Sequence, residues 1–286
     1  MTMETVRHIG VVGAGAMGSG IAQAAAMAGL DVLLLDVSTA ALQKGLAMIS
    51  NSLERLARKG KVSAEAQAAA FGRIRAVTEL AQLAAVDVVI EAATENEAVK
   101  IRILREIENV VGAETILASN TSSISITVLA AACERPQRFI GMHFFNPVPL
   151  MALIEIIRGL QTSDATHARI EALARTLGKT PITVRNHPGF VVNRILCPMI
   201  NEAIFVLAEG LASAEEIDAG MTLGCNHPLG PLALADMIGL DTLLAVMNVF
   251  YDGLNESKYR PAPLLKEMVA AGYLGRKSGR GFYRYP

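Results

Sequence analysis

Two ionisable side chains interrupt apolar, β-prone stretches in the middle of the chain. His143 lies in Gly141-Met142-His143-Phe144-Phe145-Asn146-Pro147, and Glu155 lies in Leu153-Ile154-Glu155-Ile156-Ile157. Burying either group without a partner is costly, so on neighbouring strands each could serve as the partner of the other. The glutamate would then fix one imidazole tautomer and make His143 a general base. The alternative is a hydrogen-bonded core histidine and a separate charge on an edge strand.

The start of the chain indicates which reaction such a base could serve. A short apolar strand is expected at residues 6–12, a helix at 19–28, and a second strand at 32–35 that ends in Asp36. Between the first strand and the helix lies the GxGxxG pattern, formed by Gly13, Ala14, Gly15, Ala16, Met17 and Gly18. Strand, glycines, helix, strand and acid in this order predict a dinucleotide-binding site.

Each glycine of this pattern has a physical role. Gly13 allows a tight turn, Gly15 lets the backbone approach a pyrophosphate, and Gly18 lets helix and strand pack closely. The helix N-terminus would present N–H groups to the phosphates. Asp36 would accept hydrogen bonds from ribose hydroxyls and would repel a 2′-phosphate. Because Val37-Ser38-Thr39 offers no replacing Arg or Lys, the predicted cofactor is NAD and not NADP. FAD is a further alternative, for which nothing else in the sequence indicates a site.

Length, charge and hydropathy limit the classes of protein. The 286 residues suffice for two domains, and a net charge of −1 attracts neither nucleic acid nor an anionic membrane. Although 52% of the residues are hydrophobic and the mean hydropathy is +0.38, no transmembrane helix is expected. The first strand begins too early for a signal peptide. Three scattered cysteines, without metal-ligand spacing, suit a cytoplasmic protein with reduced thiols.

The middle of the chain continues the alternation of strands and helices. Helices are expected at 40–60, 63–73 and 97–111, and strands at 87–92 and 115–118. The pattern predicts an α/β fold with a Rossmann-type, doubly wound, mostly parallel sheet. Polar clusters at 93–96, 119–123 and 143–146 follow strand ends, where ligands bind in such sheets. Taken singly, each cluster could also consist of turn or helix-cap residues.

The composition changes near residues 186–189. A last strand is expected at 182–184, and only helices are expected after it. The first, at 190–211, is interrupted by Pro198, and the second begins at a capping box formed by Ser213 to Glu216. Two more are expected at 231–254 and 262–271. The expected domains are an NAD-binding domain at 1–187 and an all-α substrate-binding and dimerisation domain at 188–286. Because large apolar helices in a small domain need covering, we expect a homodimer, with a thick-cored monomer as the alternative.

With these motifs the chain resembles the L-3-hydroxyacyl-CoA dehydrogenases, especially the bacterial 3-hydroxybutyryl-CoA dehydrogenases. The resemblance covers essentially the whole chain. Its motifs are the dinucleotide fingerprint, Ser119-Asn120-Thr121-Ser122-Ser123, Gly141 to Pro147, Pro188-Gly189-Phe190-Val191-Val192-Asn193-Arg194, Pro228-Leu229-Gly230-Pro231 and Gly279-Arg280-Gly281-Phe282-Tyr283.

The resemblance implies roles for individual residues. His143 and Glu155 match the proton-transfer pair of the family, while Ser122 and Asn193 match its catalytic serine and asparagine, which also contact substrate. The implied cofactor contacts, besides the fingerprint, are Asp36, Glu95, Lys100, Ser122, Asn146 and Lys277. Coenzyme A contacts map to Ser52 and Lys59, for which a solvated helix face is an equal alternative. His187, just before Pro188-Gly189, departs from the family pattern.

The implied activity is NAD-dependent interconversion of an (S)-3-hydroxyacyl-CoA, such as 3-hydroxybutyryl-CoA, and the 3-ketoacyl-CoA, such as acetoacetyl-CoA. Fatty-acid oxidation, aromatic degradation and butyrate or polyester synthesis are all open as pathways. One alternative is a CoA-independent hydroxy-acid or sugar-acid dehydrogenase; such enzymes often use a lysine base, and no lysine is placed as well as His143. The other is a non-catalytic, crystallin-like dinucleotide-binding protein. The joint presence of His143, Glu155, Ser122 and Asn193 argues against it.

Overall fold

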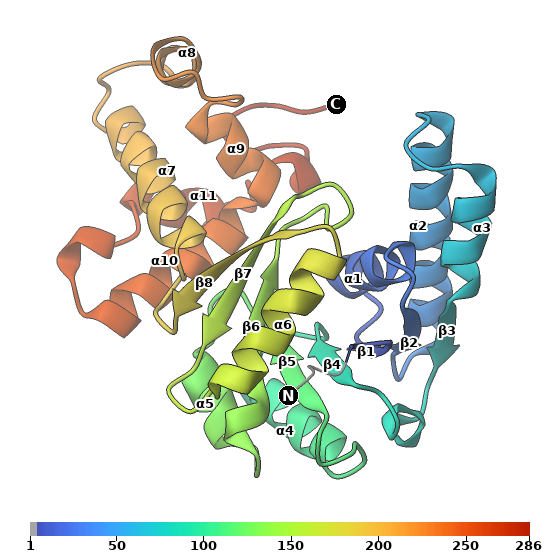
Figure 1. Ribbon diagram of the computed structural model, residues 1–286. Helices are drawn as coiled ribbons and strands as arrows, with labels where there is room; N and C mark the ends of the chain where they lie inside the picture. Colours follow the sequence, from blue (N-terminus) through green and yellow to red (C-terminus); the bar gives the residue numbers. More distant parts are fainter. Residues whose placement is uncertain (1–4) are drawn as a thin grey trace. The chain divides into compact units, whose positions relative to one another are not determined.

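The computed structural model describes residues 5–286 (Figure 1). They form two compact units that meet in the sequence between Asn186 and His187. The first unit is an α/β unit around one sheet, and the second is helical. This architecture confirms the predicted fold class. The division lies beside the domain boundary expected from composition.

The first unit is built on an eight-stranded sheet with the strand order β3-β2-β1-β4-β5-β6-β7-β8. Its strands are β1 (His8–Val12), β2 (Asp31–Leu35), β3 (Ile74–Val77), β4 (Val88–Glu91), β5 (Ile116–Ser119), β6 (Phe139–Phe144), β7 (Leu153–Arg158) and β8 (Thr180–Arg185). Strands β1 to β6 pair in parallel, whereas β7 runs antiparallel to β6 and parallel to β8. The carboxyl ends of β1 to β6 therefore share one border of the sheet, which we call the carboxyl edge.

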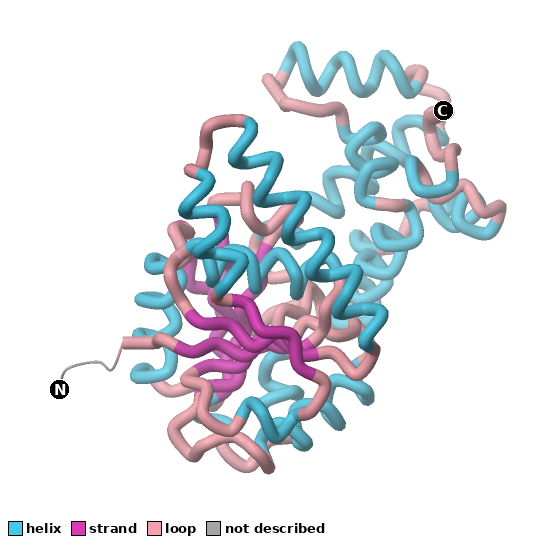
Figure 2. The backbone as a smooth tube through the Cα atoms, turned by 90° about the vertical axis from the view of Figure 1, so that its right-hand side faces the viewer, coloured by secondary structure: helices cyan, strands magenta, loops and turns pink. Residues whose placement is uncertain are grey.

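Helices cover both faces of this sheet (Figure 2). They are α1 (Ala16–Met27), α2 (Thr39–Arg58), α3 (Ala64–Gly72), α4 (Glu97–Glu108), α5 (Ile126–Ala131) and α6 (Asp164–Thr176), with short 3₁₀ turns at Leu80–Leu83 and Pro136–Arg138. Many of them begin at a polar cap. Ser38, Ser63 and Asn96, for example, each accept a backbone N–H of the first turn.

The alternation of side chains along the strands decides which residues face which helices. Met142, Phe144, Ile154 and Ile156 belong to a buried cluster that also includes residues of α1, α2 and α6. Successive side chains of a strand point to opposite faces. His143 and Glu155 consequently project from the other face, where α5 packs on β6 and β7.

The second unit consists of helices and short turns. They are α7 (Val192–Ala208), α8 (Ala214–Ala219), a π-helical turn at Gly220–Gly224, α9 (Pro231–Ile238), α10 (Leu240–Leu254), α11 (Pro263–Ala270) and 3₁₀ turns at Ser257–Tyr259 and Arg276–Ser278. Helix α7 continues through Pro198. The predicted capping box is confirmed, because Glu216 N–H bonds to Ser213 Oγ while Ser213 N–H bonds to Glu216 Oε2.

The prediction of a single helix at 231–254 is wrong, because two helices occupy this range. Helices α9 and α10 meet at Gly239, which has a φ of 101°, and their axes bend by 98°. A positive φ suits glycine because it has no Cβ. No single helix within residues 5–286 is both long and apolar enough to cross a bilayer; the α9–α10 pair passes by length and composition only when its two bent halves are counted together.

Buried Asp236 anchors the end of the chain to α9. Its carboxylate accepts the N–H groups of Phe282 and Tyr283 at 3.0 and 2.9 Å and the hydroxyl of Tyr285 at 3.0 Å. This arrangement explains part of the terminal Gly279 to Tyr283 motif. A Cβ at Gly281 would lie 1.9 Å from Asp236 Oδ1.

Candidate active site

The glycine-rich turn lies between β1 and α1 and has the geometry that a dinucleotide needs. Gly13 has a φ of +102° and donates its N–H to Leu35 O at 2.7 Å. A Cβ at Gly18 would lie 1.8 Å from Gly13 O, so only glycine allows the helix to pack so close to the turn. A Cβ at Gly15 would meet no atom within 4 Å. The space above Gly15 is therefore open to a ligand.

Asp36 stands beside this turn, directly after β2. Its Oδ2 accepts the N–H of Ala14 at 2.9 Å, and its Oδ1 accepts the N–H of Ser38 at 2.9 Å. The first N–H groups of α1 have no acceptor within the helix, as at any helix N-terminus. Open space at Gly15, a helix N-terminus and a fixed carboxylate at the end of β2 fit the pyrophosphate and ribose of NAD.

His143 and Glu155 face each other across β6 and β7. They are register partners in this antiparallel pair, and His143 Nδ1 lies 2.7 Å from Glu155 Oε2. The glutamate is completely buried and His143 is 6% exposed. An ionised carboxylate only accepts hydrogen bonds, so opposite an ionised Glu155 the proton of a neutral imidazole belongs on Nδ1. The ring of Phe145 lies 4.6 Å from the imidazole, centroid to centroid.

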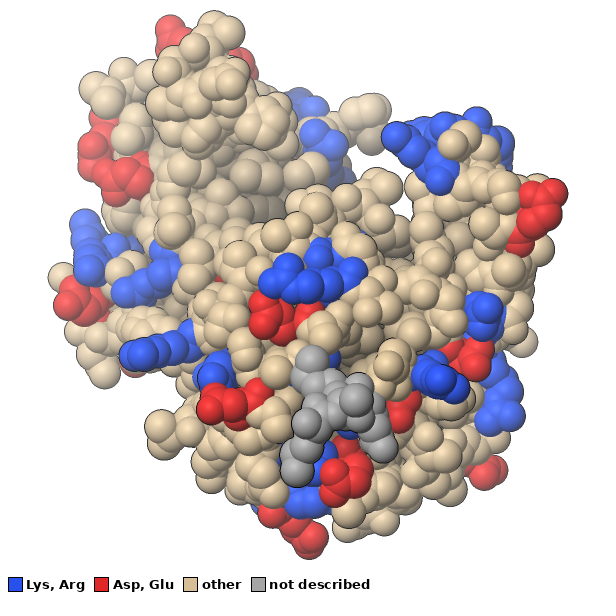
Figure 3. Space-filling view, viewed as in Figure 1, with Lys and Arg blue, Asp and Glu red and all other residues tan. Residues whose placement is uncertain are grey.

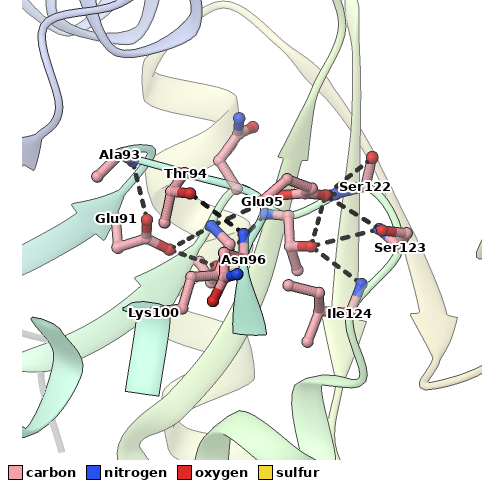
Figure 4. Close-up of polar contacts among 12 residues, drawn as sticks. Glu91, Ala93, Thr94, Glu95, Asn96, Lys100, Ser122, Ser123 and Ile124 are labelled. Atoms are coloured by element: carbon pink, nitrogen blue, oxygen red, sulfur yellow. Dashed lines mark hydrogen bonds and ion pairs between the residues drawn. The ribbon is translucent and has the colours of Figure 1, made fainter. Parts of the chain in front are cut away.

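A second polar cluster joins the ends of β4 and β5 (Figure 4). Glu95 Oε1 accepts the N–H of Ser122 at 2.7 Å and its hydroxyl at 3.0 Å, together with the hydroxyl of Thr121 at 2.8 Å. Lys100 Nζ lies 3.6 Å from Glu95 Oε2 and 2.6 Å from Glu91 Oε2. The structure thus brings three predicted cofactor contacts, Glu95, Lys100 and Ser122, into one network.

The segment that follows β6 is also tied to the carboxyl edge. Asn120, after β5, accepts the N–H of Phe144 at 2.9 Å. Lys179 donates from Nζ to the carbonyls of Val148 and Met151 at 2.6 and 2.8 Å. Burial lowers the pKa of Lys179. These bonds fix both ends of the segment that carries exposed Asn146.

The predicted coenzyme A contacts lie on α2. Ser52 is half-buried within the helix, and exposed Lys59 is its C-cap. Figure 3 shows basic side chains gathered where α2 meets α3. The basic residues of that region are Arg55, Arg58, Lys59 and Lys61. Such a group suits the phosphates of a coenzyme A moiety.

Two predicted site residues belong to the second unit. Asn193 is half-buried in the first turn of α7. Lys277 lies in the turn at Arg276–Ser278, and its Nζ donates to Asp241 Oδ2 at 2.6 Å.

Glu91 and Lys179 were not among the residues expected in the site. The sequence could have indicated Glu91, because it is a carboxylate at the end of an apolar strand, just as Asp36 follows β2. It could not have indicated Lys179, since the partners of this lysine are backbone carbonyls distant in the sequence.

Two family models together match nearly the whole chain. Residues 8–187 match the family model described as 3-hydroxyacyl-CoA dehydrogenase, NAD binding domain. Residues 189–285 match the model described as 3-hydroxyacyl-CoA dehydrogenase, C-terminal domain.

Individual relatives are similar over their full lengths. The 3-hydroxybutyryl-CoA dehydrogenase of Bradyrhizobium diazoefficiens is 54% identical, over 98% of this chain and 96% of that protein. The 3-hydroxybutyryl-CoA dehydrogenase of Clostridioides difficile is 47% identical, over 97% of this chain and 99% of that protein. The crystal structure of (S)-3-hydroxybutyryl-CoA dehydrogenase PaaH1 from Ralstonia eutropha is 64% identical, with a TM-score of 0.96 over 99% of this chain and 100% of that one.

Proposed function

The chain belongs to the 3-hydroxyacyl-CoA dehydrogenase family, and we propose that it interconverts (S)-3-hydroxybutyryl-CoA and acetoacetyl-CoA with a His143–Glu155 proton-transfer pair. Family membership makes the protein an NAD-dependent oxidoreductase. The short-chain substrate is proposed from the relatives that carry this activity in their names. The observation that carries the proton-transfer role is the buried hydrogen bond of 2.7 Å between the two side chains.

NAD supplies the hydride acceptor for C3 of the substrate when it is bound, and NADH the donor in reverse. As hydride leaves C3, His143 accepts the proton of the 3-hydroxyl at Nε2. Glu155 keeps the other nitrogen protonated and stabilises the imidazolium that forms. In the reductive direction the imidazolium returns its proton to the oxygen at C3.

Ser122 and Asn193 are the proposed contacts to the reacting oxygen or the thioester carbonyl. Ser122 donates its hydroxyl hydrogen to Glu95 in this structure. A serine has one hydroxyl hydrogen. To donate to a keto oxygen, Ser122 must therefore release Glu95, whereas it can accept from a 3-hydroxyl without doing so.

A substrate series tests the proposal. We expect the protein to oxidise NADH fastest with acetoacetyl-CoA, more slowly as the 3-ketoacyl chain lengthens, and negligibly with free acetoacetate. Equal rates with free acetoacetate would favour a CoA-independent hydroxy-acid dehydrogenase instead. Binding of NADH without oxidation by any member of the series would favour the non-catalytic alternative.

The oligomeric state and the cellular location belong to the same proposal. A homodimer formed through the second unit is supported by exposed apolar side chains there, which include Leu223 at 87% and Leu211 at 76% exposure. A cytoplasmic location suits the three free cysteines, of which Cys133 and Cys197 are buried and Cys225 is exposed.

A further inference from the structure

A completely buried carboxylate at the carboxyl edge has no role in the mechanism above. Glu91 is the last residue of β4, and none of its surface is exposed. It accepts hydrogen bonds from Lys100 Nζ at 2.6 Å, from Ser119 Oγ at 2.9 Å and from the Ala93 N–H at 2.8 Å. A charge buried in this way is costly unless its partners are well placed, so the carboxylate and its donors fix one another.

The three donors come from three separate segments of the edge. Ala93 lies in the connection from β4 to α4, which also carries Glu95. Lys100 lies on α4, and Ser119 ends β5 directly before the polar loop at 120–123. Each segment holds at least one proposed cofactor contact. A single buried carboxylate therefore links all three.

The network links Glu91, Lys100, Glu95 and the loop at Ser122 (Figure 4), and it extends from buried to partly exposed side chains. The side chains of Glu91 and Lys100 are 0% and 1% exposed, whereas that of Glu95 is 45% exposed. Lys100 lies between the two carboxylates, and the second one holds the backbone and hydroxyl of Ser122. If Glu91 lost its charge, Lys100 would be drawn toward Glu95, which would then bind the Ser122 loop less firmly.

We propose that Glu91 is a positioning residue for the cofactor. It sets the position of the Lys100 ammonium and, through Lys100 and Glu95, the position of Ser122. The inference rests on the proposed contacts of Lys100, Glu95 and Ser122 with NAD(H). It does not depend on which acyl-CoA the enzyme uses.

The test is the dissociation constant for NADH, measured by fluorescence without acyl-CoA. Glu91→Gln keeps the shape of the side chain and an oxygen acceptor but removes the charge. We expect the dissociation constant to rise about tenfold, the effect expected when a charge-assisted hydrogen bond to the cofactor is weakened. The titration contains no substrate, so it does not depend on the proposed reaction. If the protein bound NADH but did not reduce acetoacetyl-CoA, the proposed function would be contradicted, while the effect of Glu91→Gln on NADH binding could still be measured.

Glu108→Gln is the matched control. Glu108 ends α4, is buried, and accepts from the Glu134 and Arg135 N–H groups at 2.7 and 2.9 Å and from Arg135 Nε at 3.2 Å. It resembles Glu91 in burial and pairing, but it lies at the C-terminal end of α4, whereas Lys100, the partner of Glu91, lies near the N-terminal end. Both variants should unfold at lower temperature, and only Glu91→Gln should lose NADH affinity. An equal loss in both variants, or none in Glu91→Gln, would overturn the proposal.

A double variant separates action through Lys100 from general loosening. In a Lys100→Met background, adding Glu91→Gln should change NADH affinity far less than it does in the wild-type protein. If Glu91→Gln had the same effect on NADH affinity in both backgrounds, Glu91 would not act through Lys100. If Glu91→Gln does not fold, Ser119→Ala serves as the second variant, because it removes one hydrogen bond to Glu91 and leaves the carboxylate charged. It should lower NADH affinity by less than the tenfold expected for Glu91→Gln. Unchanged NADH affinity in Ser119→Ala would refute the positioning role of Glu91.

Discussion

The imidazole of His143 owes its position to the register of two antiparallel strands. His143 and Glu155 are directly opposed in β6 and β7, so the pairing of the two strands brings their side chains within hydrogen-bond distance. Two ionisable residues within apolar runs left a pair and two separate buried groups as alternatives, and the family resemblance implied the pair. The sequence could not predict their register, which depends on how the segment at 145–152 turns.

Replacing Glu155 tests whether the carboxylate does more than hold the ring. Glu155→Gln retains an acceptor for Nδ1–H but loses the charge that stabilises an imidazolium. We expect turnover to fall about tenfold to a thousandfold, with the dissociation constant for NADH unchanged. Turnover and NADH titration on the same preparation check this. A loss of NADH affinity equal to the loss of turnover would indicate a folding defect instead.

The cysteines provide a chemical check on burial. Burial raises the pKa of Cys133 and of Cys197 to about 12, so both remain thiols at pH 8, whereas Cys225 is exposed. Iodoacetamide should therefore modify Cys225 alone in the native protein and all three cysteines in guanidinium chloride. Mass spectrometry of the digested protein measures this. Rapid native labelling of Cys133 or Cys197 would contradict the packing described.

At the scale of elements, the turn between β1 and α1 was the most predictable part of the chain. Its glycines answer local requirements: a positive φ at Gly13, open space at Gly15 and a close backbone contact at Gly18. The GxGxxG pattern indicates all three before any tertiary contact is known.

Two alanine variants separate stability from cofactor binding in this turn. In Gly18→Ala the new methyl group would collide with Gly13 O, so we expect a loss of about 1–3 kcal/mol of stability. In Gly15→Ala the methyl group meets no protein atom, so stability should stay within about 0.5 kcal/mol while NADH binding weakens severely. Thermal unfolding and NADH titration measure the two effects. Unchanged NADH affinity in Gly15→Ala would exclude the pyrophosphate from this position.

Some of the elements and contacts that sequence did not predict lack a strong local pattern. Strand β3 has only Ile74, Arg75, Ala76 and Val77, too short a run to show the alternation of a strand. The bend at Gly239 separates two segments that are equally apolar, so nothing in the pattern marks a change of direction. The Glu91 network likewise depends on contacts between segments far apart in sequence, such as that with Ser119.

For the whole molecule, the exposed apolar side chains of the second unit predict a dimer. Ile195, Leu211, Leu223 and Met237 are 68%, 76%, 87% and 53% exposed. Burying these four apolar side chains against a second copy of the chain would remove them from water, which favours a dimer. Light scattering should give twice the chain mass of 30.3 kDa. A mass equal to that of one chain at micromolar concentration would rule out the stable homodimer.

The proposed activity of the whole molecule combines a cofactor turn, a loop network and a proton-transfer pair, and His143→Gln tests the last of these most directly. Single-turnover oxidation of NADH by acetoacetyl-CoA should be about 10²- to 10⁴-fold slower than in the wild-type enzyme, the usual contribution of one general acid or base. The dissociation constant for NADH should be unchanged. A near-normal rate in His143→Gln, with NADH bound normally, would contradict the assignment of proton transfer to this histidine.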